Sequence, residues 1–134
     1  MLPTESRPPA ELPSDAVVVL TVYGSLFFAS AAVFESQLPV ATEASSGSVV
    51  VLRLRGKEEL GSTFIKTIVR YHDSLAAAGS HLVITGLGDR LLGQLRSTGA
   101  LERLGSDNVF PARPNVGESL QAGLRRARQL QGRP

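Results

Sequence analysis

The sequence predicts an α/β fold: a mixed, mostly parallel sheet of about five strands, with about four to five helices packed on it and a β-hairpin at its N-terminal end. β-branched apolar runs, typical of buried strands, alternate along the chain with stretches in which apolar residues recur at helical spacing. Strands that are joined through helices run parallel. The chain has 134 residues, of which 43% are hydrophobic and 19% charged, enough for one domain with a core.

The N-terminal segment, residues 1–15, contains four prolines among polar residues. This composition is typical of an extended linker, so we expect a proline-rich lead-in. The composition changes abruptly at Ala16. The predicted domain therefore covers residues 16–130, and residues 131–134 form a tail.

The first part of the domain predicts a hairpin. Residues 16–23, AVVVLTVY, indicate a strand that is buried on both faces, and the Gly-Ser pair after it indicates a turn. Residues 26–29, LFFA, then form a short returning strand. Because adjacent side chains on a strand point to opposite faces, we expect Phe27 and Phe28 to be buried on either side of the sheet.

Helices and strands alternate through the rest of the chain. Ser30 can cap a helix that continues to about Thr42. The elements that follow are strand 49–55, a helix from Ser62 or Thr63 to about Ala78, strand 81–87, a helix from Asp89 to Ser97, strand 108–110 and a helix from about Val116 to Leu130. Gly79 is a typical residue to end the second of these helices.

The composition disfavours several classes of function. The chain has no cysteine, which excludes disulfides, thiolate metal sites and cysteine nucleophiles. Its formal charge of +2 does not favour nucleic acid as a partner. His72 and His81 lack metal-binding spacing, and no arrangement of catalytic residues stands out. We therefore expect no bound metal and no catalytic residues, and we do not expect the chain to be an enzyme. No apolar run reaches the roughly 20 residues that a helix needs to span a membrane.

Residues 85–90, TGLGDR, lie between a predicted strand and a predicted helix. Gly86 and Gly88 could bring backbone amides near a phosphate at the start of the helix, beside Asp89. These three residues are the candidate contacts for a nucleotide or phosphate. The alternative is a tight strand–helix turn without a ligand.

Ser62 and Thr63 are candidate regulatory residues, because an anion is favoured at the start of a helix and a phosphate there would add charge to a surface. Simple capping of the helix is the alternative. Arg125, Arg126 and Arg128 form a basic cluster on the last helix. Such a cluster is either a solvated face or a contact for anionic lipid headgroups or an acidic partner.

Three stretches resemble the STAS domain, a module shared by sulfate transporters and anti-sigma factor antagonists. Residues 22–38, VYGSLFFASAAVFESQL, look like the transporter form, in which a G-x-L-F-F-A hairpin leads into the first helix. Residues 60–68, LGSTFIKTI, occupy the place of the family's D-S-[ST]-G segment. Residues 96–111, RSTGALERLGSDNVFP, look like the family's S-G-L-x-x-x-L-G-x-x-N-x-F-P ending. The resemblance extends from about Pro13 to the C-terminal helix.

The resemblance implies a STAS fold and the C-terminal cytoplasmic domain of a SulP-type anion transporter. Such a domain is regulatory and assembly-related, and a membrane part would transport sulfate, bicarbonate or a related anion. The implied partner is the membrane domain of the same transporter, at the cytoplasmic side of the inner membrane, and pairing with a second copy stays open. Some family members bind nucleotides, which makes the TGLGDR segment and the first hairpin candidate contacts.

The main alternative is a soluble anti-sigma factor antagonist switched by phosphorylation at Ser62, which aligns with the residue phosphorylated in antagonists. Gly61 stands where the family usually has aspartate, and Phe64 where it has glycine. The loss of the acid and the added bulk, which would obstruct a kinase, favour the transporter module. A phosphoacceptor receiver is disfavoured because the first two main strands end without the acidic residues that hold magnesium.

Overall fold

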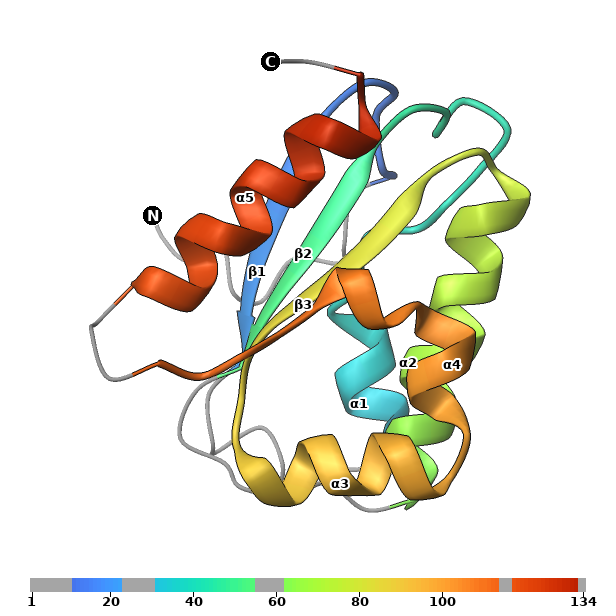
Figure 1. Ribbon diagram of the computed structural model, residues 1–134. Helices are drawn as coiled ribbons and strands as arrows, with labels where there is room; N and C mark the ends of the chain where they lie inside the picture. Colours follow the sequence, from blue (N-terminus) through green and yellow to red (C-terminus); the bar gives the residue numbers. More distant parts are fainter. Residues whose placement is uncertain (1–10, 23–30, 55–61, 114–116, 133–134) are drawn as a thin grey trace, which may run out of the picture.

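A computed structural model describes residues 11–22, 31–54, 62–113 and 117–132 of the chain. In chain order the elements are β1 (Val17–Val22), α1 (Ala31–Ser36), β2 (Val49–Leu54), α2 (Ser62–Ala77), β3 (His81–Leu87), α3 (Asp89–Ser97), α4 (Ala100–Leu104), a 3-10 turn (Ser106–Asn108), β4 (Val109–Pro111) and α5 (Glu118–Leu130). Strands and helices alternate as the sequence predicts, and the α/β fold is confirmed (Figure 1).

The described strands form one sheet in the order β1-β2-β3-β4, and every neighbouring pair is parallel. Val17 pairs with Val49, and Val49 with His81, so β1, β2 and β3 start at the same edge of the sheet, whereas β4 starts opposite Ile84 of β3. The described part of the chain thus has four strands, where about five were predicted in a mixed sheet. The predicted hairpin strand with Phe27 and Phe28 lies outside the described residues.

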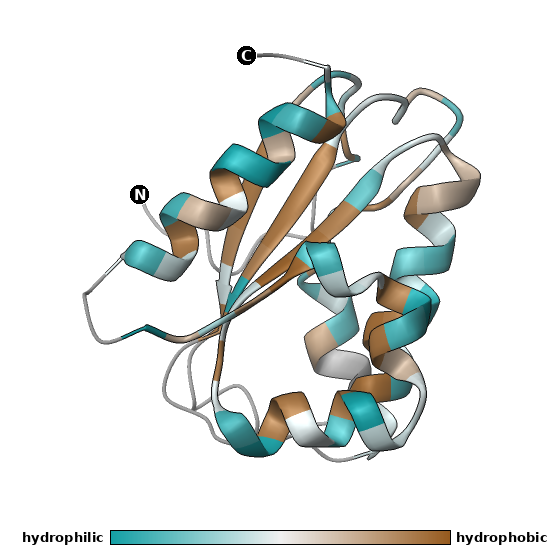
Figure 2. Ribbon diagram, in the orientation of Figure 1, coloured by the Kyte–Doolittle hydropathy of each residue, from teal (hydrophilic) through white to brown (hydrophobic). Residues whose placement is uncertain are grey.

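Helices cover both faces of the sheet (Figures 1 and 2). Successive side chains of the central strands point to opposite faces, and each face has its own apolar cluster of strand and helix residues. Val50 and Leu52 of β2 point to the larger cluster, which holds side chains of α1, α2, α3 and α4. Val49 and Val51 point to the smaller cluster, together with Ala127 of α5. Among the described helices, α5 therefore forms one layer by itself, and the others form the second.

The prediction that the first strand is buried on both faces is wrong for β1. Val17 and Val19 are 37% and 42% exposed. They pair with Val49 and Val51 and so belong to the face that α5 covers, but α5 packs on β2, β3 and β4. A continuous apolar run in the sequence does not show whether a helix packs on both faces of its strand, and α5 packs mainly on β2, β3 and β4.

Helix α1 is shorter than predicted. It ends at Ser36 instead of near Thr42, and the N–H groups of Gln37 and Leu38 donate to carbonyls three residues earlier in the chain. Pro39 disfavours helical geometry at the residue before it, which explains the early end.

The C-terminal third contains a helix that the sequence analysis missed. Helix α4 has five residues and lies between Gly99 and Gly105, both with left-handed φ angles, of 82° and 92°. Helix α5 begins at Glu118, later than the predicted Val116, after Gly117 with a φ of 83°. Glycine adopts such angles without the steric cost that other residues meet, so these positions delimit the helices.

Part of the predicted lead-in belongs to the folded body. Leu12 is fully buried, and its N–H donates to the carbonyl of Val40 at 2.8 Å. Its carbonyl accepts a 2.5 Å hydrogen bond from Ser45 Oγ, and the Pro13 carbonyl accepts one from Ser48 Oγ. Residues 11–16 are thus fastened to the loop before β2, upstream of the boundary expected at residue 16.

Candidate functional site

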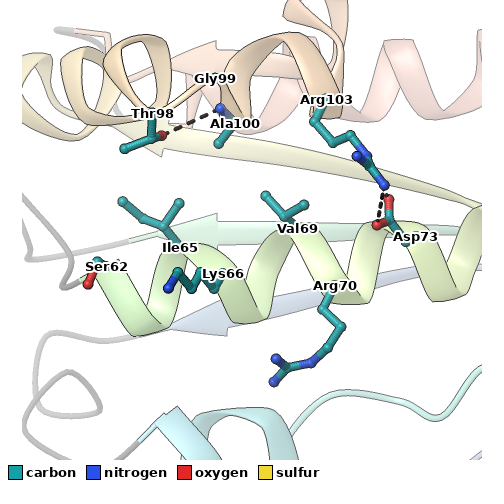
Figure 3. A pocket seen from close by; sticks show the side chains of 10 residues that line it. All are labelled: Ser62, Ile65, Lys66, Val69, Arg70, Asp73, Thr98, Gly99, Ala100 and Arg103. Carbon is teal, nitrogen blue, oxygen red and sulfur yellow. Dashed lines mark hydrogen bonds and ion pairs between the residues drawn. The ribbon is translucent and has the colours of Figure 1, made fainter.

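A groove of about 450 Å³ runs along α2, with the start of α4 on its other side (Figure 3). The residues that line it are Ser62, Ile65, Lys66, Val69, Arg70 and Asp73 of α2, and Thr98, Gly99, Ala100 and Arg103 of the turn into α4 and α4 itself. The α2 residues recur three or four positions apart, so they form one stripe along the helix. Helix α4 has only five residues and contributes Ala100 and Arg103 to the groove.

The groove has an apolar floor. Ile65 and Ala100 are buried in the large core cluster, and Val69 is half-buried beside them. These positions are apolar because the same face of α2 that lines the groove continues into the core. Any ligand that fits here must therefore offer apolar surface.

An ion pair closes one end of the groove. Arg103 Nε and Nη2 donate to the two carboxylate oxygens of Asp73 at 3.2 and 2.7 Å, which ties α4 to α2 (Figure 3). His72 Nδ1 lies 3.0 Å from Asp73 Oδ1. The hydrogen bonds from His72 and Arg103 hold the pKa of the Asp73 carboxyl below its usual value. The ionised form of Asp73 is therefore stabilised by His72 and Arg103.

The two candidate regulatory residues, Ser62 and Thr63, are exposed and form the start of α2. Ser62 is the first helical residue, so it lies inside the helix and not in the preceding cap position. The Thr63 carbonyl accepts a hydrogen bond from Thr67 Oγ1 at 3.0 Å. Of the two, Ser62 lines the groove.

Phe64, expected to obstruct a partner kinase, is half-buried. Its ring centroid lies 5.4 Å from that of Phe34, with the ring planes 46° apart, so it packs against α1. This inward packing weakens the steric argument drawn from the sequence. The absence of an acid at position 61 is unaffected, since it is a fact of sequence.

The TGLGDR segment is a strand–helix connection in which one expected donor is already used. Gly86 lies within β3 at a shift in strand register, with a φ of 83°. Its N–H donates to Ser119 Oγ at 2.9 Å, so it is not available to a phosphate. Gly88 precedes α3 and has open space beside it, whereas the exposed Asp89 adds negative charge at the helix start. The geometry favours the tight-turn alternative.

The arginines of α5 differ from one another. Arg125 and Arg128 are exposed, whereas Arg126 is half-buried. Arg126 Nε donates to Asn108 Oδ1 at 2.9 Å and links α5 to the turn before β4. Because α5 and α2 cover opposite faces of the sheet, the structure does not bring these arginines to Ser62.

The two histidines do not meet, and each is half-buried. His81 opens β3, and burial lowers its pKa, as do the charges of Arg126 and His72. Within the described ranges, no three histidine or acidic side chains gather in a way that could hold a metal ion. None of the helices described is both long and apolar enough to cross a bilayer.

Sequence reasoning missed most of the groove. It singled out Ser62 but not Lys66, Arg70, Asp73 or Arg103. The helical spacing of the α2 residues could have indicated a shared stripe. No local pattern could have joined Asp73 to Arg103, which lie 30 residues apart on different helices.

Comparison with known proteins identifies the family to which this fold belongs. The family model of the STAS domain matches residues 9–119. Among curated proteins, no sequence gives a significant match. A sulfate transporter family protein from Wolinella succinogenes is 18% identical, with 96% of this chain and 94% of that chain covered and a TM-score of 0.56; this likeness shows the fold alone.

The STAS domain of a SulP transporter from Vibrio cholerae is 26% identical, with 88% of each chain covered and a TM-score of 0.60. The resemblance seen in the three sequence stretches is thereby confirmed. The family match over most of the chain and the parallel sheet with its helices lead to one conclusion: the chain belongs to the STAS domain family.

Proposed function

We propose that this chain is the regulatory and assembly domain of a SulP-type anion transporter, and that it acts by binding other protein segments without catalysing a reaction. The observation that carries the proposal is the 26% identity to the Vibrio cholerae SulP transporter STAS domain over 88% of both chains. The groove along α2 supports it, because an open channel with an apolar floor suits the binding of a protein segment.

The N-terminal contacts suggest how such a domain would be coupled to a transporter. A membrane portion upstream would enter the body through residues 11–16, which are fastened by Leu12, Ser45 and Ser48. A displacement of the membrane portion would then move the whole domain, because residues 11–16 are held by hydrogen bonds and the burial of Leu12 and cannot move independently of it. The partner of the domain is the membrane domain of the same transporter, and the domain lies on the cytoplasmic side of the membrane. The transported anion is sulfate, bicarbonate or a related anion.

Anion uptake tests this function. The transporter that carries this domain is compared with a version lacking residues 11–132, in proteoliposomes with labelled sulfate and labelled bicarbonate. At equal amounts of inserted protein, we expect the deletion to change the uptake rate of one anion. Equal rates for both anions in both versions would contradict a regulatory role.

A second candidate, the soluble anti-sigma factor antagonist, is favoured by one observation: Ser62 is exposed at the start of α2 and lines the groove. A cognate kinase should then label the chain, and Ser62→Ala should abolish the labelling, whereas Thr63→Ala should not. Labelling that is absent, or unchanged by Ser62→Ala, argues against this candidate.

Finer features of the proposal have separate tests. Nucleotide sensing would involve Gly88 and Asp89, and titration of ATP and GTP followed by amide chemical shifts would detect it.

Contact with the membrane surface would involve Arg125 and Arg128, whose charges favour anionic lipid. Binding to phosphatidylserine vesicles should then fall when both are changed to glutamate. Pairing with a second copy would appear as a dimer in sedimentation.

A further inference from the structure

We propose that the groove along α2 docks an acidic amphipathic helix of a partner protein. This inference deepens the proposed function, on which it rests for the idea that the domain acts by docking, and it specifies the chemistry of the partner. Three properties of the groove carry the inference: its shape, its floor and the charge of its rims.

The shape of the groove suits a helix. The stripe on α2 extends from Ser62 to Asp73, which at 1.5 Å per residue is about 16 Å, or three turns. Residues at this spacing are the ones that a helix presents to a second helix packed along it. Helix α4 has only five residues and meets part of the stripe. The part of the stripe that α4 leaves open can accept a partner helix of up to about three turns.

The floor requires an apolar face on the partner. Ile65 and Ala100 are almost fully buried, and Val69 is half-buried, so the bottom of the groove is continuous with the core. Leucine-sized side chains at helical spacing would be removed from water here, which is the main source of affinity in helix-in-groove recognition. A ligand that is polar throughout, such as a nucleic acid strand, does not match this floor.

The rims require acidic residues on the partner. Lys66 and Arg70 are exposed along α2, and Arg103 lies on the opposite side of the groove (Figure 3). Asp73, the one acid among the lining residues, is paired with Arg103, so these two charges offset each other and the charges of Lys66 and Arg70 remain. The rims are therefore positive on balance, and glutamates beside the apolar face of a partner helix would complement them.

Existing contacts do not block such a partner. Arg70 pairs with Glu35 of α1 at 3.2 Å, but both side chains are about half exposed or more. Exposed pairs contribute little free energy, so a carboxylate of the partner can compete for Arg70. A second copy of the chain fits less well, because a two-fold contact would bring the same positive rims together.

The test uses the full 134-residue chain and two synthetic helical peptides of about three turns. Both peptides have leucines along one face. In the first, glutamates flank the leucines; in the second, lysines take their place. We expect the glutamate peptide to shift the amide signals of α2 and residues 98–104, and the lysine peptide to bind at least about fivefold more weakly. Equal binding of the two peptides, or shifts confined to other faces, would overturn the proposal.

A matched pair of variants tests the site itself. Lys66→Glu reverses a charge on the rim and should weaken the glutamate peptide at least about fivefold, because an attraction becomes a repulsion. Arg128→Glu makes the same kind of change on α5, across the sheet, and should change binding less than about twofold. Circular dichroism confirms that both variants fold. An unchanged affinity in Lys66→Glu would sink the assignment.

Sedimentation of the chain separates the remaining occupant from the proposed one. A dimer that Lys66→Glu dissociates would assign the groove to a second copy and would overturn the proposal. Because all these measurements use the isolated chain, their failure leaves the transporter proposal standing. Conversely, an uptake experiment that contradicts the transporter role does not affect whether the groove binds an acidic helix.

Discussion

Gly123 determines how closely α5 approaches the sheet. A Cβ atom built on it would collide with Cγ2 of Thr85 and lie 3.4 Å from Cγ1 of Val83, both side chains of β3. A side chain at position 123 must therefore push α5 outward or distort β3. Glycine is required here by the close approach and not by its backbone angles, because its φ lies outside the left-handed region.

The first prediction compares two glycines in helices. Gly123→Ala should lower the free energy of unfolding by about 1–3 kcal/mol, because it overpacks the contact with Thr85. Gly93→Ala in α3 is the control: apart from its chain neighbours and the backbone of its own helix, no heavy atom lies within 4 Å of the added methyl group, so the better helix former should raise the free energy by about 0.5–1 kcal/mol. Urea unfolding measures both, and changes of the same sign would contradict the packing described here.

At the scale of elements, residues 11–16 act as a strap across the end of the sheet. Ser48 Oγ accepts a hydrogen bond from the Ala16 N–H at 3.0 Å, and Ser48 N–H donates to Ser80 Oγ at 3.0 Å. Gln131, just after α5, donates to the carbonyls of Ala16 and Gly47 at 3.2 and 3.0 Å. The strap therefore connects segments that precede β1, β2 and β3 with the end of α5.

The second prediction tests this strap. Leu12→Ala should lower the free energy of unfolding by about 2–5 kcal/mol, because a fully buried leucine leaves a cavity. Val40, opposite the strap and 51% exposed, serves as the control, and Val40→Ala should cost less than about 0.5 kcal/mol. Thermal or urea unfolding gives both values. A small effect of Leu12→Ala would show that the body does not depend on its lead-in.

The third prediction concerns the tie between α2 and α4. Hydrogen bonds from His72 and Arg103 lower the pKa of Asp73 in the folded chain, so its carboxylate stabilises the fold above the ordinary pKa of 3.8. This contribution is lost as the pH falls from there through the lowered folded-state pKa. Arg103→Gln should raise the pKa of Asp73 part of the way back, because His72 remains. Carboxyl carbon NMR during an acid titration measures it, and an unchanged pKa would refute the tie.

Sequence patterns predicted long elements well. Helix α2 was expected over 62–78 and α3 over 89–97, and both follow from repeated apolar positions and a glycine or turn at the end. Helix α4 was not predicted, because five residues are too few to show the helical spacing of apolar positions. The groove escaped for a related reason: Asp73 and Arg103 meet only through the packing of two helices, which local spacing does not record.

At the scale of the whole molecule, the sheet separates two surfaces. Helix α2 lies on one side of the sheet and α5 on the other (Figure 1). The groove is therefore on the side of α2, and the exposed Arg125 and Arg128 are on the side of α5. A partner in the groove and an anionic surface beside α5 would therefore not compete for the same residues. Such an arrangement is what a module needs if it joins a transporter at a membrane to another protein.

The proposed function requires this domain to operate as part of a membrane-bound anion transporter. Its most direct test is to separate membranes from the cell extract and detect the domain with an antibody raised against residues 11–132. We predict that the signal follows the membrane fraction, on a polypeptide much larger than the 14.2 kDa of this chain. A signal found in the membrane-free fraction, at 14.2 kDa, would contradict the claim.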